Sequence, residues 1–580
     1  MGVRASHGAA ARHRSGQPLG GGRGGRDGER AQGADPQRSV PVRCVHRGRD
    51  RGGSRGVRGG ATPGGGRGVV TRRGWAVVIL AAWAVSLGWL VKREFFRTTG
   101  ERLAEAALAV PPGTQFYRVD LGAQQVGFAS TTVDTLGTTL RVTDLLLLDL
   151  PALGRLHHTR VRSVAVVSRA LRLETLQADF EGDAERFSAR AVVSGDSVLT
   201  LTLASAGDSQ TTRTRITHPI VVPSLLPVRL AFGGALKPGR TFALRVFDPL
   251  ELAERDVSVT IAAESTLVVS DSAGFDSTAM AWTPARLDTV RAFRLEQRMG
   301  GLTTSAWIDA QGRVVRATGP VGLTLERSAY EIAYQNFRRR DTARLLRAGA
   351  PPGANDVIAL TAITAGAPLA ATGRDELRVR LRGVDLSGLD LAGGRQRLVG
   401  DTLIVRREAP AALTTAYKLP ARDTTLARWL APEPLVQSGA PSIRAQAHEL
   451  LGGEQDPAVA AARLTHWVAA HMRKEITMGI PSAVRVLAQG RGDCNELTVL
   501  YVALARAAGL PARPVAGLVD LGGRFYYHAW PEVYLGDWVA VDPTLDQFPA
   551  DAGHLRFAAG GLARQVELIR FVGRLKLEVL

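Results

Sequence analysis

The sequence contains very little cysteine. Only Cys44 and Cys494 occur among its 580 residues, which excludes the framework of disulfide bonds that stabilises many small secreted domains. Hydrophobic residues make up 45% of the chain, and its length is typical of about three to five domains, each able to bury its own core. We therefore expect a multidomain protein that folds without oxidation.

Acidic residues are scarce only at one end of the chain. Residues 1–73 contain 16 Arg against 4 Asp and Glu, a net charge of +12, which leaves +7 of the total of +19 for the other 507 residues. The main body is therefore nearly balanced in charge, and its composition does not indicate a nucleic-acid partner.

Large apolar residues are almost absent from residues 1–73, which include 20 Gly. Such a segment cannot bury enough surface to fold, so we predict disorder. Three interpretations remain open: a disordered cytoplasmic tail, an RNA-binding tail of the Arg-Gly-Gly type, or residues that are not translated because synthesis starts near Val69 or Val70. We favour the last interpretation, and the RNA-binding tail least.

A run without charged residues covers residues 74–91. Its eighteen residues would form a helix of about 27 Å, long enough to cross a bilayer core. Arg72-Arg73 and Lys92-Arg93 flank it, and the excess of Arg on the N-terminal side places that end in the cytoplasm. We predict a single-pass transmembrane helix with the C-terminal body outside the cytoplasm. A cleaved signal peptide is disfavoured, because Lys-Arg-Glu-Phe-Phe-Arg follows the segment directly and an Ala-x-Ala such as that at residues 107–109 lies well downstream of it.

Alternating apolar and polar residues recur from Phe116 to Tyr334, with turn residues between them. This pattern predicts an antiparallel β domain over residues 110–345. A linker rich in Pro and Gly follows, and then a small β module over residues 356–425. No set of metal ligands and no nucleophile stands out in the middle of the chain, and His157-His158 are given no role in a site.

The setting of Cys494 favours a reactive thiol. Apolar residues at helical spacing follow it, Asp493 is a good N-cap, and Glu496 completes a capping box. Cys494 then occupies the first helical position, where unpaired amides and the positive end of the helix dipole favour the thiolate. The alternative is a buried cysteine that acts as a small hydrophobic residue, but the polar residues on both sides argue against it.

His528 and Asp542 lie on two predicted strands. The first strand is expected at residues 525–534 and the second at residues 538–541. A three-residue loop at 535–537 would place Asp542 opposite Trp530 and diagonal to His528, about 7–8 Å away on the same face. A two-residue loop would turn Asp542 to the other face, so we predict the odd-length loop or a bulge. Taken singly, each residue would be an ordinary core histidine or a turn aspartate.

A thiol, an imidazole and a carboxylate in this order are the parts of a nucleophilic acyl-transfer site. Four motifs resemble the bacterial branch of the transglutaminase-like superfamily over about residues 440–550. They are Gly-Asp-Cys at 492–494, Ala-Arg-Ala-Ala-Gly-Leu-Pro-Ala-Arg at 505–513, His-Ala-Trp-Pro-Glu-Val-Tyr at 528–534 and Trp-Val-Ala-Val-Asp-Pro-Thr at 538–544.

The resemblance implies a papain-like α+β core over residues 440–580 and a catalytic triad of Cys494, His528 and Asp542. Animal members usually have Trp directly after the cysteine, whereas this chain has Asn495, so calcium-dependent crosslinking of glutamine to lysine is not implied. The backbone amide of Cys494 is a natural oxyanion donor, and a second donor is not assigned. No cofactor is implied.

Together these features predict a membrane-anchored, outward-facing thiol enzyme that acts on amide bonds of proteins or peptides, with the cell envelope as the expected source of its substrates. The thioester would be resolved by water, in a protease or amidase, or by an amine, in a transamidase; we favour hydrolysis because no calcium site is evident. The alternative is a non-catalytic binding or scaffold protein of the cell envelope that retains the fold.

Overall fold

The computed structural model describes residues 112–340, 357–365 and 373–580, apart from short gaps. The gaps are residues 153, 184–185, 196, 206–207, 222, 234–235, 249–252, 300–301, 320–321, 410–412, 414, 478–479, 562–563, 566–567 and 569–570. The predicted tail at 1–73 and the predicted transmembrane helix at 74–91 both lie outside the described residues. Within the described residues, no helix has the length and apolar character that a membrane crossing requires.

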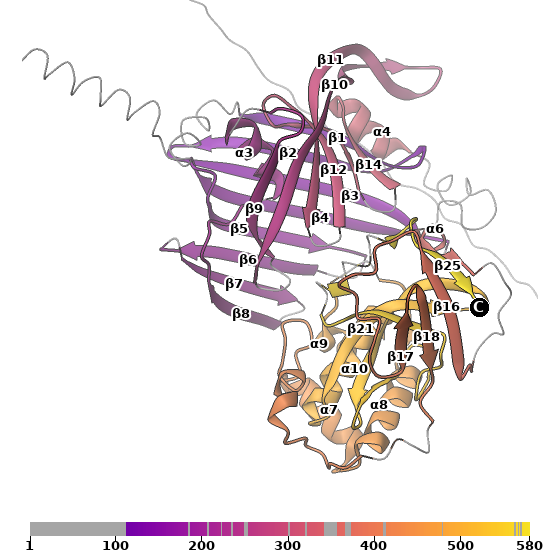
Figure 1. Ribbon diagram of the computed structural model, residues 1–580. Coiled ribbons are helices and arrows are strands. Elements are labelled where there is room, and N and C mark those ends of the chain that lie inside the picture. The colour runs from indigo at the N-terminus through magenta and orange to yellow at the C-terminus, as the bar shows by residue number, and fades with distance from the viewer. Residues whose placement is uncertain are drawn as a thin grey trace, which may run out of the picture. The chain divides into compact units, whose positions relative to one another are not determined.

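The middle of the chain forms one antiparallel sheet of fourteen strands (Figure 1). Strands β1 to β8 follow one another as a meander, β9 to β14 form a second meander, and pairing of β1 with β14 joins the two. The predicted antiparallel β-rich middle of the chain is thus confirmed. The strands are β1 (Gly113–Leu121), β2 (Gln124–Leu136), β3 (Thr139–Ala152), β4 (Arg155–Ser168), β5 (Leu173–Glu181), β6 (Arg186–Ser194), β7 (Val198–Ser205), β8 (Asp208–Arg215), β9 (Thr241–Asp248), β10 (Ala253–Asp276), β11 (Ala281–Met299), β12 (Leu302–Asp309), β13 (Val314–Thr318) and β14 (Leu323–Arg327).

A short helical segment between the two meanders packs against the sheet and contributes side chains to its core. It consists of the 3-10 helix η1 (Pro223–Leu225) and the helix α3 (Leu226–Gly233). Leu225 and Val228 pack with buried residues of β3 to β7, whereas Leu226 and Leu230 pack with buried residues of β10 to β12. One helical segment therefore contributes to both halves of the sheet. A second helical segment, η3 (Glu331–Gln335) and α4 (Asn336–Arg339), follows β14, and its Ala333 and Phe337 pack with Phe128 of β2.

The C-terminal part contains a two-stranded parallel sheet of β19 (Arg473–Lys474) and β20 (Arg491–Gly492), and two larger sheets. One has the strand order β17-β18-β16-β25, and the other has the order β15-β22-β21-β24, with β23 also paired to β22. Their strands are β15 (Ile363–Thr364), β16 (Glu376–Arg382), β17 (Gln396–Val399), β18 (Thr402–Arg406), β21 (Ala512–Asp520), β22 (Arg524–Tyr534), β23 (Trp538–Ala540), β24 (His554–Ala559) and β25 (Lys576–Val579).

These two sheets join the ranges 356–425 and 440–580, which the sequence pattern treats as separate modules. Strand β25, at the end of the chain, pairs with β16. Buried residues of β16 and β18 also belong to the same hydrophobic cluster as buried residues of β21 and β24. The small β module and the C-terminal domain therefore share one core.

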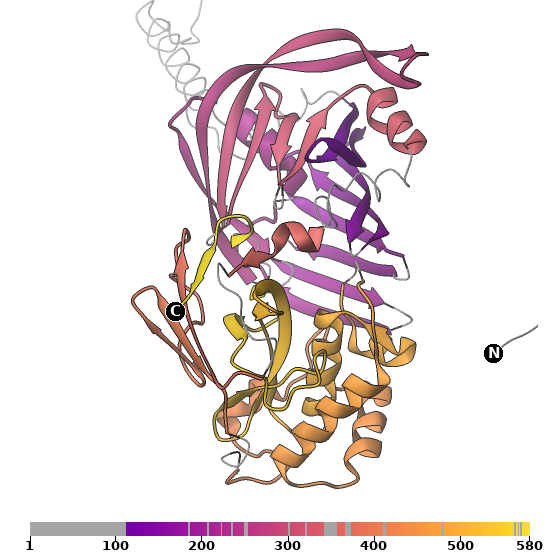
Figure 2. The ribbon, with the colours of Figure 1, turned by 90° about the vertical axis from the view of Figure 1, so that its right-hand side faces the viewer.

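Four helices pack together beside the second sheet (Figure 2). They are α7 (Pro441–Leu451), α8 (Pro457–His471), α9 (Ala483–Gln489) and α10 (Cys494–Ala507). From Glu496 to Arg506 every residue of α10 is buried, so this helix is the centre of the cluster. Val533 and Val539, from β22 and β23, complete the cluster on the sheet side. A helical layer against an antiparallel sheet is the α+β arrangement expected for this part of the chain.

Gly517 allows three strands to approach one another. It lies on β21 opposite His528 of β22 and Arg556 of β24. A Cβ atom at this position would lie 1.9 Å from the carbonyl oxygen of Leu555 and 3.0 Å from the Trp530 ring. No side chain fits there, so glycine is required by the close packing of backbone on backbone.

We expect Gly517→Ala to destabilise the C-terminal part by about 1–3 kcal/mol, because the added methyl group has to displace backbone atoms. Calorimetry should show a thermal midpoint lowered by about 2–4 °C for each kcal/mol lost. Gly439→Ala is the matched control, since its Cβ would meet nothing closer than 3.6 Å. Equal midpoints for the two variants would contradict the close approach.

Candidate active site

Cys494 is the first residue of α10, as the capping pattern predicts. Asp493 Oδ1 accepts hydrogen bonds from the backbone amides of Asn495 at 2.9 Å and Glu496 at 3.2 Å. In return, the Asp493 amide donates to Glu496 Oε2 at 3.2 Å, which completes the capping box. The Cys494 side chain is partly buried. The helix thus begins at a fixed point and places the thiol at its positive end.

The side chain of Glu496 anchors the start of α10 to neighbouring residues. Its Oε1 accepts a hydrogen bond from Arg485 of α9 at 2.7 Å, and its Oε2 accepts one from Thr477 at 2.7 Å. Both Arg485 and Glu496 have side chains only 3% exposed. Burial, followed by the negative charge of Glu496, raises the pKa of Asp493 to about 7. The first turn of α10 is therefore built on a buried ion pair, which is costly to break by removing one partner.

The predicted three-residue loop brings Asp542 to His528. Tyr534 pairs with Trp538, which leaves Leu535, Gly536 and Asp537 as the loop. The Val541 amide donates to the Pro531 carbonyl at 3.0 Å, so the register continues beyond the end of β23 at Ala540. His528 Nε2 then donates to Asp542 Oδ2 at 2.8 Å.

Asp542 is completely buried, and both of its carboxylate oxygens are occupied. Oδ1 accepts hydrogen bonds from the amides of Thr544 at 2.7 Å and Leu545 at 3.1 Å. Burial alone would raise the pKa of Asp542, but the neighbouring His528 and His554 outweigh it and hold that pKa well below its usual range. The carboxylate therefore stays ionised and cannot rotate away from the imidazole.

Cys494 lies close enough to the His528 ring for its charge to act on that ring. Because Nε2 of that ring already binds Asp542, Nδ1 is the atom left for the sulfur. Burial lowers the pKa of His528, but the charge of Asp542 and then that of Cys494 outweigh it and raise this pKa to about 10. The structure thus brings together all three residues predicted from the sequence, and at neutral pH it favours a protonated imidazole beside the sulfur.

Glu532 fixes the strand that carries His528. Its side chain is 1% exposed and forms ion pairs with Arg513 of β21 at 2.6 Å and Arg556 of β24 at 2.7 Å. The three strands are thereby tied together by charge-assisted hydrogen bonds, the stronger kind in proteins.

The sequence pattern does not reveal His554, which also contacts Asp542. His554 Nε2 lies 2.9 Å from Asp542 Oδ2, and its Nδ1 lies 3.1 Å from Asp551 Oδ1. Trp530 packs beside both imidazoles, with its ring centroid 6.0 Å from that of His528 and 5.2 Å from that of His554. The contact between His554 and Asp542 depends on the pairing of β24 with β21, for which the local sequence carries no signal.

Three side chains at this site offer ligand atoms that are close enough for a metal ion. Among the described residues, His528, Asp542 and His554 form such a group, with ligand atoms within 4.8 Å of one another. Both imidazoles direct Nε2 at the same carboxylate oxygen, however, at hydrogen-bonding distance. A hydrogen-bond network accounts for this geometry in full.

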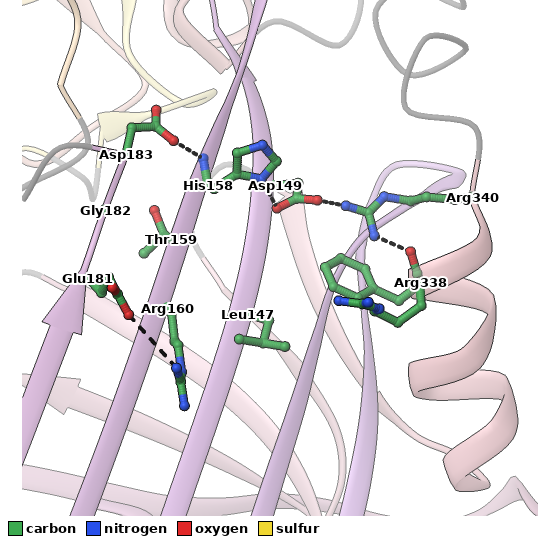
Figure 3. Close-up of a pocket in the computed structure, with 11 residues that line it drawn as sticks. Leu147, Asp149, His158, Thr159, Arg160, Glu181, Gly182, Asp183, Arg338 and Arg340 are labelled. Carbon is green, nitrogen blue, oxygen red and sulfur yellow. Dashed lines mark hydrogen bonds and ion pairs between the residues drawn. The ribbon is translucent and has the colours of Figure 1, made fainter. Parts of the chain in front are cut away.

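A cavity of about 550 Å³ lies elsewhere, beside β3, β4, β5 and α4 (Figure 3). None of the triad residues lines it. His158 Nδ1 lies 2.6 Å from Asp149 Oδ1, and Arg340 forms an ion pair with the same aspartate. The neighbouring His157 is buried and bonded to Asp183 at 2.9 Å. The two histidines noted in the sequence are therefore held by carboxylates of the β domain.

Cys494 thus lies at a helix start, and His528 lies beside the buried Asp542, on an α+β core. Residues 444–543 match the family model described as the transglutaminase-like superfamily. This part of the chain is thus a transglutaminase-like domain, as the motifs predict.

The similar proteins cover the chain only in part. An uncharacterised protein of Haemophilus influenzae is 33% identical over 75 residues, which are 12% of this chain and 20% of that protein. Among solved structures, a provisionally assigned cysteine protease from Cytophaga hutchinsonii is 16% identical, covers 37% of this chain and 83% of its own, and has a TM-score of 0.24. A β-barrel-like protein of unknown function from Brucella abortus is 14% identical, covers 37% of this chain and 94% of its own, and has a TM-score of 0.26.

The raised pKa of His528 predicts a specific pH dependence. Iodoacetate is an anion, and its reaction with Cys494 is assisted by the neighbouring imidazolium. Since Asp542 and Cys494 raise the pKa of His528 to about 10, we expect the alkylation rate to hold through neutral pH and to fall only as the pH approaches that value. In Asp542→Asn the fall should come at lower pH, because the amide supplies no charge. A fall centred near the ordinary value of about 6.5 in the unaltered protein would contradict this electrostatic account.

Proposed function

We propose that this protein is a thiol enzyme that cleaves or transfers the acyl group of amide bonds in proteins or peptides. The observation that carries the proposal is the placement of three residues. Cys494, at the start of α10, lies close enough to act on the charge of His528, and His528 binds the buried Asp542 at 2.8 Å. Cys494 is the nucleophile, His528 is first the general acid and then the general base, and Asp542 orients the imidazole and stabilises its charge.

In the first half of the reaction, the Cys494 sulfur attacks the amide carbonyl carbon and His528 protonates the departing amine. The products of this half are a thioester and a free amine. The backbone amide of Cys494 is available to the oxyanion, since the N-cap side chain binds only the amides of Asn495 and Glu496. In the second half, water or a second amine attacks the thioester, and His528 takes its proton as the sulfur leaves.

We favour water as the second nucleophile and peptides or proteins of the cell envelope as substrates. The location follows from the charge-free segment at residues 74–91, flanked by Arg72-Arg73 and Lys92-Arg93, which would anchor the chain with its body outside the cytoplasm. The motifs that identify the transglutaminase-like domain do not require an amine as the acceptor of the acyl group.

A thiol probe tests whether the site is reactive. Iodoacetamide at neutral pH should label Cys494 rapidly in the full chain, and His528→Ala should lower the rate by about a hundredfold or more, because the imidazole no longer assists the sulfur. His466→Ala is the matched control. His466 also binds a carboxylate, Asp546, at 2.6 Å, but lies exposed on α8. Slow labelling that His528→Ala leaves unchanged would point to a scaffold protein that retains the fold.

Product analysis separates hydrolysis from transfer. We expect the full chain to release new carboxyl termini from envelope peptides, with incorporation of oxygen from labelled water and little incorporation of a labelled amine. Cys494→Ala should abolish both products. Predominant amine incorporation would assign the protein as a transamidase, and identical products with Cys494→Ala would contradict the proposed nucleophile.

A further inference from the structure

Two histidines from different strands meet at one oxygen of Asp542. His528, on β22, approaches Oδ2 to 2.8 Å, and His554, the first residue of β24, approaches the same atom to 2.9 Å. The side chains of Asp542 and His554 are both 0% exposed. His554 therefore cannot touch a substrate, and any effect that it has on the reaction must pass through Asp542.

The partners of His554 fix its charge. On one side Nε2 faces the carboxylate of Asp542, and on the other side Nδ1 faces Oδ1 of Asp551 at 3.1 Å and the Asp551 carbonyl at 3.3 Å. An ionised carboxylate and a carbonyl can only accept hydrogen bonds. Both ring nitrogens must therefore carry a proton to satisfy these contacts, which makes His554 an imidazolium between two carboxylates.

Asp542 needs a second partner at one stage of the proposed reaction. When His528 passes its proton to the departing amine, it becomes neutral, and Asp542 loses its counter-charge while it remains fully buried. A buried carboxylate without a charged partner is strongly unfavourable. Through its hydrogen bond to the carboxylate, His554 would keep Asp542 ionised and in place at this stage.

We propose that His554 is a positioning residue of this site, which holds the Asp542 carboxylate in the orientation and charge state that His528 needs throughout the cycle. The inference rests on the proposed function, because it assigns His554 a role in the same reaction. Asp551 supports it in turn, since burial is outweighed by His554 and by the amides of Gly373 and Gly553, which hold the pKa of Asp551 well below its usual range.

Alkylation of Cys494 by iodoacetamide tests this role without a known substrate. In the full chain, His554→Leu should lower the rate on the order of 10- to 100-fold, as is typical when a partner that orients a reacting group is removed. His554→Gln should restore part of the rate, because its amide N–H can still donate to Asp542. The control His466→Leu removes an exposed histidine that also binds a carboxylate and should leave the rate unchanged.

The outcomes separate the possible failures. If the unaltered protein itself reacts slowly, both the proposed function and this inference are overturned. If it reacts rapidly and His554→Leu does too, only the role of His554 is overturned. Equal losses in His554→Leu and His554→Gln that follow a lowered thermal midpoint would show a merely structural role. One equivalent of metal in the purified protein, lost in His554→Leu, would show that the group binds a metal and would also overturn the inference.

Discussion

The site depends on the burial of one carboxylate. Asp542 is inaccessible to water, and four hydrogen bonds hold it, two from the amides of Thr544 and Leu545 and two from imidazoles. A charge in such a place is stable only if all of its lone pairs are satisfied and a counter-charge is close. These requirements fix the ring of His528 from one side. Cys494, at the start of a capped helix, lies close enough to the same ring to act on its charge.

The surrounding fold serves to bring these three side chains together. The odd-length loop between β22 and β23 sets the face on which Asp542 lies. The buried ion pair of Arg485 and Glu496 fixes the position at which α10 begins. Glu532 ties β22 to the neighbouring strands through two arginines. Each of these features acts on the backbone that carries a residue of the proposed triad. The relative positions of the three side chains are thereby kept while protons move between them.

Features that depend on near neighbours in the chain could be predicted from the sequence. The helix start at Cys494 follows from Asp493 and Glu496, and the contact between His528 and Asp542 follows from the length of one loop. Features that depend on distant pairing could not. His554 reaches the site because β24 lies beside β21, and the small β module joins the C-terminal domain because β25 lies beside β16. The pairing of β1 with β14, which unites the large sheet, is likewise invisible to local pattern. In each case the partner strand is selected by burial of a shared core, a property of the whole fold.

The central claim is that the Cys494 sulfur and the His528 ring share one pocket, and a bifunctional reagent measures this directly. Dibromoacetone alkylates a thiol with one bromomethyl group and then reacts through the other with a nucleophile a few ångströms away. Proteolysis and mass spectrometry of the treated protein should reveal a peptide that contains Cys494 joined through a three-carbon bridge to a peptide that contains His528. Attachment at Cys494 alone, or a bridge from Cys494 to a different side chain, would contradict the account.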